Sequence, residues 1–188
     1  MSIRKKILAI SIGPVLVLGV ITLLFMLTMV KSSLMDEVQD ALKGTAAATL
    51  AAYDQNTGDY LESTNGDIWK GSYNISKSES LVDRIKENTG MDVTFFYGNK
   101  RIMTSALDKK GNRILGSEAG ERVVNQVIKG KKPFFSTNVS LDGTRNYGYF
   151  IPVYQNGTTD QVIGMVFVGT NKARKDAIVN KILGSIMM

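Results

Sequence analysis

The sequence of 188 residues contains no cysteine and no histidine. Without cysteine there is no disulfide framework and no thiolate metal site, and without histidine the commonest general base and metal ligand are missing. Most hydrolase and metalloenzyme interpretations are weakened, so we expect no metal site, no cofactor and no enzymatic activity. The length and the hydrophobic content of 44% suffice for one domain with a core, but not for two sizeable ones.

Charge is missing from a long run near the N-terminus, ILAISIGPVLVLGVITLLFMLTMV at residues 7–30. As a helix this run would be about 36 Å long, against about 30 Å for the hydrocarbon core of a bilayer. It is longer than the apolar part of a signal peptide and lacks an A-x-A end, so we predict an uncleaved transmembrane helix. Basic residues precede it and acidic residues follow, so residues 1–6 are expected in the cytoplasm and residue 31 onward outside.

The membrane helix is expected to continue as one rod into residues 31–56, because no glycine or proline occurs from Val20 to Lys43. A stripe at helical spacing predicts one buried face there, formed by Leu34, Val38, Leu42, Thr45, Thr49 and Tyr53. At the other end, residues 172–188 are expected to form a helix that finishes in AIVNKILGSIMM, which is too short to span a bilayer. This end is either amphipathic or the start of a truncated second transmembrane segment, and we favour truncation because the apolar end would otherwise stay unburied.

Between the two ends, turn residues and apolar runs alternate. Residues 54–77 are rich in Asn, Asp, Gly, Ser and Thr and predict a long loop. The stretch SESLVDRIKENTG predicts a helix that Ser78 or Ser80 caps and Gly90 ends. Two strand-like runs follow, joined by residues 98–100, and Ser117 is expected to cap a further helix, SEAGERVVNQVIKG. Three more strands are predicted in FFSTNVSL, TRNYGYFIPVY and QVIGMVFVGT.

This order of elements, with short hairpins between the later strands, favours a mainly antiparallel sheet that the long helix covers on one face. We therefore predict an α+β fold in which an N-terminal transmembrane helix continues into a long helix. A PAS-like domain with a five-stranded antiparallel sheet follows at residues 57–171. Gly148 and Gly164 lie inside strand patterns, where glycine often marks a bulge or a close approach.

Basic residues gather around the first hairpin, FFYGNKRIMTSALDKKGNRILG at residues 95–116. Lys100, Lys109 and Lys110 lie in turns and are expected to be solvated. Arg101 has apolar neighbours in the sequence, so two locations remain open for its side chain, a pocket and the surface. In a regular strand Arg101 would share a face with Met103 rather than Thr104, so Arg101 and Thr104 point the same way only if the strand is bulged.

Four features carry a family resemblance. They are the Gly-x-x-Arg-x-x-Thr-Ser hairpin from Gly98 to Ser105, the Gly-x-Arg-x-x-Gly-Ser turn from Gly111 to Ser117, the Tyr-x-Tyr-Phe-Ile-Pro strand from Tyr147 to Pro152, and the closing Ile-Gly-Met strand. With these features the sequence resembles the single Cache domains of bacterial methyl-accepting chemotaxis receptors. It is similar, more distantly, to the outer domains of citrate- and dicarboxylate-sensing histidine kinases.

The resemblance implies a pocket between the sheet and the excursion after the second strand, which binds a small molecule, often a carboxylate. Arg101 would clamp the carboxylate, and Thr104 or Ser105 would supply a hydroxyl where citrate-type sensors use histidine. Ser117 would offer its hydroxyl and the amides of the helix that it caps. The other implied ligand-binding residues are Ser136, Asn138, Tyr147, Tyr149 and Phe150.

The resemblance further implies a ligand-sensing domain of a chemoreceptor in a bacterial cell membrane. Such a receptor would be a homodimer through the long helix, would signal by helix displacement, and would have its cytoplasmic signalling module outside this chain. A histidine kinase or a cyclic-nucleotide enzyme with the same outer domain is the nearest alternative.

Two other classes of protein, and nucleic acid as a partner, are disfavoured. A membrane-anchored enzyme would need something like a Ser-Lys dyad, and no Ser-x-x-Lys element lies in a convincing context. A pilin would carry a Gly-Phe processing site and an early glutamate, which the apolar run lacks. Nucleic acid is not an expected partner, because the basic residues have no exposed aromatics interleaved with them.

Overall fold

The computed structural model describes residues 3–186, which divide into two compact units. One unit contains residues 39–176 and is termed the sheet unit below; the other contains the two ends of the chain.

The helix α1 (Ile3–Asp54) is 52 residues long. A window of 18 residues in its Ile12–Asp54 part has a mean hydropathy of 2.4. Among the described residues, this one helix is long and apolar enough to cross a membrane, and an N-terminal signal sequence would pass the same test. The predicted long apolar helix at the N-terminus is therefore confirmed.

The last turns of α1 bury one stripe within the sheet unit. The fully buried positions are Leu42, Ala46, Thr49 and Tyr53. The ring of Tyr53 meets the ring of Phe95 edge-on, with centroids 5.2 Å apart, and its hydroxyl lies 2.9 Å from that of Ser78. Most of the predicted stripe in this part of α1 is thus buried, but Ala46 takes the buried place expected for Thr45.

A small antiparallel sheet occupies the segment in which the sequence predicts a long loop. It consists of β1 (Tyr60–Glu62), β2 (Ile68–Lys70) and β3 (Tyr73–Asn74), and the 3-10 helix η1 (Ile75–Lys77) follows. The loop prediction is wrong because strands of two or three residues are too short to show an alternating pattern. Tertiary packing holds them: the rings of Tyr60 and Phe95 stack with centroids 5.8 Å apart, and Ile68 is buried.

The helix α2 (Glu79–Thr89) begins and ends as the sequence predicts. Gly90 closes it with a φ of 68°, a left-handed conformation that glycine adopts without a steric penalty. Ser78 occupies the N-cap position, but its hydroxyl donates to the carbonyl oxygen of Ile75 and contacts Tyr53 instead of capping the helix. The predicted cap hydroxyl therefore ties α2 to α1.

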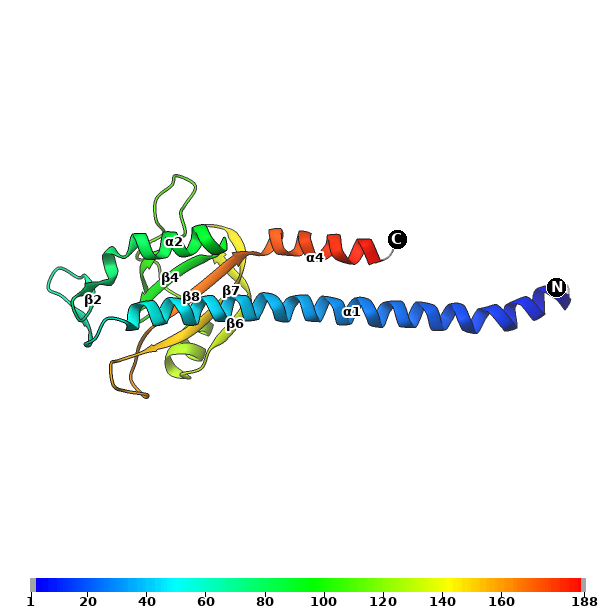
Figure 1. Cartoon of the computed structure of the whole chain (residues 1–188), viewed down its shortest axis with the longest axis horizontal. Coiled ribbons are helices and arrows are strands. Elements are labelled where there is room, and N and C mark those ends of the chain that lie inside the picture. Colours follow the sequence, from blue (N-terminus) through cyan, green and yellow to red (C-terminus); the bar gives the residue numbers. More distant parts are fainter. Residues whose placement is uncertain (1–2, 187–188) are drawn as a thin grey trace. The chain divides into compact units, whose positions relative to one another are not determined.

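The main sheet has five antiparallel strands in the order β5-β4-β8-β7-β6. Its strands β4, β8, β7 and β6 are labelled in Figure 1. The strands are β4 (Asp92–Tyr97), β5 (Lys100–Thr104), β6 (Phe134–Leu141), β7 (Thr144–Tyr154) and β8 (Val162–Asn171), and α4 (Lys172–Ile186) follows β8 directly. The predicted α+β fold with a five-stranded antiparallel sheet is confirmed.

The two faces of the main sheet are covered differently. On β4, Phe95 points toward α1, whereas Phe96 points to the opposite face and packs with Phe150 and Phe167. Successive side chains of a strand point to opposite faces, so neighbouring phenylalanines serve two separate layers.

A β-bulge in β5 determines where Arg101 points. Phe95 pairs with Met103 while Phe96 pairs with Arg101, so Ile102 is the extra residue. Arg101 consequently lies on the face that bears Phe96. Thr104 lies on the same face, with its hydroxyl oxygen 2.7 Å from that of Thr94. The bulge that the sequence requires for Arg101 and Thr104 to share a face is therefore present.

The chain between β5 and β6 differs from the expected helix. Residues 116–119 run beside β5, and the amide of Arg101 donates to the carbonyl oxygen of Ser117 at 2.9 Å. The helical part is α3 (Glu121–Val123), which continues as the π-helix η2 (Val124–Lys129). The predicted helix start at Ser117 is wrong, because hydrogen bonds to the edge of β5 hold this segment extended.

Glycine makes room for close approaches at the centre of the sheet. Gly148 and Gly169 are cross-strand partners, and a Cβ on Gly148 would lie 2.5 Å from Cε2 of Phe167. A Cβ on Gly164 would overlap the carbonyl oxygen of Phe96. Both glycines that the sequence singles out thus permit a close approach, one by a side chain and one by the backbone.

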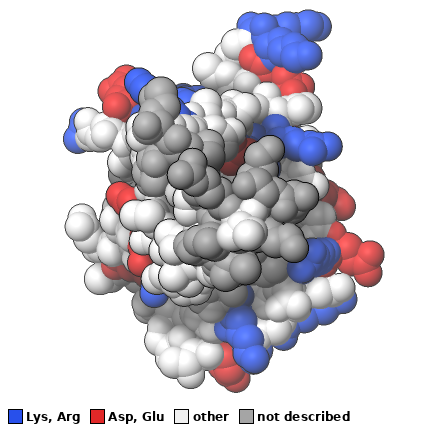
Figure 2. All heavy atoms as spheres, turned by 90° about the vertical axis from the view of Figure 1, so that its right-hand side faces the viewer, with Lys and Arg blue, Asp and Glu red and all other residues white. Residues whose placement is uncertain are grey.

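Figure 2 shows how charge is distributed on one face of the molecule. Lys and Arg, in blue, and Asp and Glu, in red, are interspersed there rather than gathered by sign.

Gly164→Ala is expected to destabilise the sheet unit by about 1–3 kcal/mol or more, because the added methyl group would push β8 away from β4. Gly44→Ala in α1 is the control: nothing outside its own helix lies within 4 Å of its Cβ position, and alanine favours a helix by about 1 kcal/mol. Chemical denaturation of the full chain in detergent, followed by circular dichroism, measures both variants. Unchanged stability of Gly164→Ala would contradict the packing described here.

Candidate ligand-binding cavity

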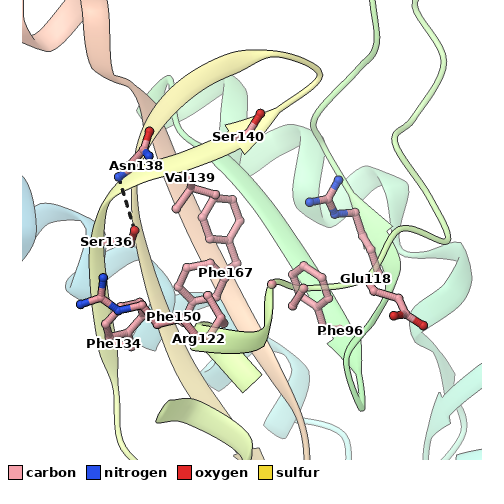
Figure 3. Close-up of a pocket in the computed structure, with 14 residues that line it drawn as sticks. Phe96, Glu118, Arg122, Phe134, Ser136, Asn138, Val139, Ser140, Phe150 and Phe167 are labelled. Atoms are coloured by element: carbon pink, nitrogen blue, oxygen red, sulfur yellow. Dashed lines mark hydrogen bonds between the residues drawn. The ribbon is translucent and has the colours of Figure 1, made fainter. Parts of the chain in front are cut away.

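A cavity of about 460 Å³ opens on the face of the main sheet that bears Phe96 (Figure 3). Pockets for small molecules typically measure roughly 300–1,000 Å³. The lining residues are Phe96, Arg101, Glu118, Ala119, Gly120, Arg122, Val123, Phe134, Ser136, Asn138, Val139, Ser140, Phe150 and Phe167. The cavity thus lies between the main sheet and the excursion that follows β5, where the family resemblance implies a pocket.

The floor of the cavity is a row of phenylalanine rings, which we term the phenylalanine row. Four adjacent strands contribute one ring each: Phe96 of β4, Phe167 of β8, Phe150 of β7 and Phe134 of β6. The ring centroids of Phe150 and Phe167 are 4.7 Å apart, and those of Phe134 and Phe150 are 6.5 Å apart. Because Phe96, Phe150 and Phe167 belong to one buried cluster, this floor is apolar and well packed.

Arg101 places a buried positive charge against the phenylalanine row. Only 8% of the residue is exposed, and its guanidinium carbon lies 5.4 Å from the ring centroid of Phe96. Nη1 donates to the carbonyl oxygen of Ile114 at 3.3 Å, whereas the buried Nε has no hydrogen-bond partner among the residues that the structure describes. No carboxylate in the described part of the chain forms an ion pair with it. Burial lowers the pKa of Arg101, and the charge of Asp92 partly offsets this effect.

Two more charged residues line the rim. Arg122 is exposed, with its guanidinium carbon 5.3 Å from the ring centroid of Phe134. Glu118 is exposed as well, and Figure 3 shows its carboxylate directed away from the phenylalanine row. With two arginines and one glutamate, the lining residues carry a net charge of +1. The cavity therefore favours an anion.

The β6 side of the cavity is polar. It presents Ser136, Asn138 and Ser140. A register shift between Ser136 and Val139 bulges β6, so that both residues face the cavity. The Oγ of Ser136 accepts from the amide of Asn138 at 3.3 Å. Hydroxyl and amide groups are thus available to a ligand at this wall.

Four of the residues that the resemblance implies line the cavity, namely Arg101, Ser136, Asn138 and Phe150. The others do not: Thr104, Ser105, Ser117, Tyr147 and Tyr149. Thr104 is fully buried, and its hydroxyl contacts Thr94 and the carbonyl oxygen of Val93. The Oγ of Ser105 accepts from the amide of Val93 at 2.9 Å. These two hydroxyls therefore brace β5 against β4.

Strand alternation separates the tyrosines from Phe150. Phe150 faces the cavity, so Tyr147 and Tyr149 on the same strand face the other side. The hydroxyl of Tyr147 donates to Asp176 at 2.5 Å and accepts from Nζ of Lys172 at 2.5 Å. Ser117 is exposed and contributes its carbonyl oxygen to the edge of β5 rather than a helix N-terminus to the cavity. Of the three implied ligand-binding residues on β7, Phe150 thus lies at the cavity, whereas Tyr147 and Tyr149 lie on the opposite face of the sheet.

The sequence patterns do not point to several of the lining residues, above all Phe96, Phe134, Phe167 and Arg122. A signal for Phe96 existed, because two adjacent phenylalanines in a strand must serve opposite faces. The positions of Phe134 and Phe167 depend on the register of β6 and β8 against β7. This register cannot be predicted from a local sequence pattern.

Arg113 ties the loop between β5 and α3 to α2. Its Nη1 and Nη2 donate to the two carboxylate oxygens of Asp83 at 2.9 and 2.5 Å, and Nη1 also donates to the carbonyl oxygen of Thr104 at 2.7 Å. These hydrogen bonds lower the pKa of Asp83. Because the loop continues into the segment with Glu118 and Ala119, the ion pair supports one wall of the cavity.

Residues 73–182 match the family single Cache domain 3. The match covers more than half of the chain, so the chain belongs to this family, and the resemblance to single Cache domains is confirmed. Comparison with curated protein sequences finds no match.

Three solved structures share the fold. An extracellular ligand binding receptor from Desulfohalobium retbaense has a TM-score of 0.55 and 15% identity, over 82% of this chain and 26% of that one. The ligand-binding domain of the Campylobacter jejuni chemoreceptor Tlp3, in complex with L-valine, has a TM-score of 0.54 and 12% identity, over 84% and 63%. A methyl-accepting chemotaxis protein X has a TM-score of 0.51 and 16% identity, over 84% and 65%.

These structures are receptors rather than enzymes, and at such low identities the likeness shows the fold alone. The present chain spans 26% to 65% of their lengths.

Asp83→Asn is expected to destabilise the chain at pH 7 and to have a smaller effect toward pH 2. The pKa of Asp83 lies below its unfolded value of about 3.9, so its contribution is present above about pH 4 and is lost as the pH falls through the folded pKa. Chemical denaturation at several pH values measures the difference from the parent chain. Asp160→Asn, in the exposed loop between β7 and β8, is the control, expected within about 0.5 kcal/mol of the parent. A difference that does not change with pH would contradict this role of the ion pair.

Proposed function

We propose that this chain is the sensing part of a bacterial transmembrane chemoreceptor and that it binds a small carboxylate through Arg101. The observation that carries the proposal is a buried guanidinium with an unpaired Nε at the wall of an open cavity. Burying a charge without a partner costs free energy, and a carboxylate would supply the missing acceptors. Arginine suits this task because its planar group binds both oxygens of a carboxylate at once.

The roles of the other cavity residues follow from their positions. Ser136 and Asn138 offer hydrogen bonds from β6, and Phe150 supplies apolar contact from the floor. Thr104 and Ser105 act indirectly, since their hydroxyls hold the hairpin that carries Arg101. The complexes of the Tlp3 domain with L-valine and with isoleucine are consistent with this proposal, because both of those ligands carry a carboxylate.

The proposed receptor has five segments along the chain. They are a cytoplasmic N-terminus (residues 1–6), a transmembrane helix (7–30), a membrane-proximal helix (31–56), the ligand-binding domain (57–171), and a helix that leads into a second transmembrane segment (172–188). The apolar helix supports the membrane assignment, and the receptor relatives support an extracytoplasmic domain. Two copies would pair through the long helix, and a cytoplasmic signalling module would receive the signal.

Signalling would proceed through the strands that form the cavity floor. Phe150 on β7 contacts the ligand, and three residues farther back Tyr147 holds Lys172 and Asp176 at the start of α4. A ligand that favours one arrangement of β7 would therefore shift the equilibrium position of α4. Helix displacement of this kind is an established way of carrying a conformational change.

Thermal unfolding of the full chain in detergent, with a panel of carboxylates, amines and neutral metabolites, tests the ligand class. A carboxylate at about 100 times its dissociation constant should stabilise the chain by roughly 2.7 kcal/mol. Arg101→Ala should abolish this stabilisation, because the ligand loses its only buried cationic partner among the lining residues.

The matched control is Arg84→Ala, which removes an exposed arginine of α2 and should leave the ligand response unchanged. Arg101→Lys keeps the charge without the planar fork and should retain only part of the response. Stabilisation by a neutral or cationic compound that survives in Arg101→Ala would refute the carboxylate proposal.

Cysteine labelling tests the membrane topology, because the natural chain contains no cysteine. Asn156→Cys lies in the exposed loop between β7 and β8, and a membrane-impermeant maleimide should label it on intact cells. Ser2→Cys, before the apolar run, should react only after the membrane is permeabilised. Labelling of Ser2→Cys on intact cells would reverse the proposed orientation.

A further inference from the structure

We propose that the ligand of this cavity is a monocarboxylate with an apolar body and no charged amine. This inference rests on the proposed function, since it takes Arg101 as the carboxylate partner, and it adds the chemical class of the rest of the ligand. Three observations carry it: a single buried cation, a floor made of phenylalanine rings, and the sign of the remaining charge.

The cavity offers one place for a carboxylate. Among its lining residues, Arg101 is the only cation that is buried, at 8% exposure, and the only one with an unpaired buried nitrogen. Arg122 is exposed and lies over Phe134, so water solvates its charge. A second carboxylate on the ligand would thus lose its hydration without gaining a buried cation as a partner. The cost of desolvating this second carboxylate would weaken binding.

The phenylalanine row faces the rest of the ligand. Phe96, Phe150 and Phe167 line the cavity from three adjacent strands with 1–3% of each residue exposed, whereas Phe134 is only partly buried. Figure 3 shows Phe134 and Arg122 beyond Phe150. The row is apolar, so contact with it favours a ligand body that gains by leaving water. Rings also pack well against rings, which makes an aromatic body the best match.

The charge around the cavity opposes an α-ammonium group. The only carboxylate among the lining residues belongs to Glu118, which is exposed and points away from the phenylalanine row (Figure 3). Beside Arg101, an ammonium group would meet a like charge and no buried anion. An amino acid is therefore expected to bind more weakly than the carboxylic acid that lacks only its amine.

The test is calorimetric titration of the full chain in nanodiscs with 3-phenylpropionate, phenylalanine, acetate, succinate and citrate. We expect 3-phenylpropionate to bind at least tenfold more tightly than each of the others. Titration of protein-free nanodiscs of the same lipid subtracts any partition of the apolar acid into lipid.

Two variants keep the test informative if one of them folds poorly. Phe134→Ala, at the partly buried edge of the row, should weaken 3-phenylpropionate severalfold and leave acetate unchanged. Ser136→Lys adds a second cation at the β6 wall and should improve succinate relative to 3-phenylpropionate at least tenfold.

The outcomes separate this inference from the proposed function. If succinate, citrate, acetate or phenylalanine binds as tightly as 3-phenylpropionate and depends on Arg101, the proposed function stands and the apolar monocarboxylate is overturned. If none of the five acids binds, or if binding persists in Arg101→Ala, both are overturned.

Discussion

The pairing of β5 with β4 determines where the buried cation of this protein lies. Ile102 is the extra residue of the β-bulge, and because of it Arg101 and Thr104 face the same side of the main sheet. In a regular strand one of these two residues would turn toward α1, into the layer that Tyr53 and Phe95 fill with aromatic rings. The buried positive charge of the cavity depends on this one-residue irregularity.

Under the proposed function, Arg101 represents a conflict between stability and ligand binding. A chain selected for stability alone would pair a buried guanidinium with a carboxylate or replace it with an apolar side chain. Here Nε stays without a partner, while the surroundings are otherwise closely packed and the ring of Phe167 fits over Gly148 and Gly169. An unsatisfied polar group in a well-packed setting is what a site that awaits an anion requires.

The two faces of the main sheet make different contacts. One face carries the phenylalanine row and the cavity, and the other carries the contacts to α1 and, through Tyr147, to the first turn of α4. Because successive residues of a strand alternate between these faces, a displacement of β7 acts on both sides at once. In the proposed receptor, β7 would in this way couple ligand contact to the position of α4.

Local chemistry in the sequence determined the long apolar helix, the cap at Gly90, five of the strands and the pattern of the single Cache domain. Each of these features follows from the hydropathy, the periodicity or the turn preference of consecutive residues. The tertiary structure alone decided the three short strands after α1, the extended path of residues 116–119 and the members of the phenylalanine row. The hydrogen bonds to β5 hold Ser117 in an extended segment, although serine is a preferred helix cap. The register of β7 determines which face Tyr147 occupies. In both cases long-range hydrogen bonds and burial outweigh local propensity.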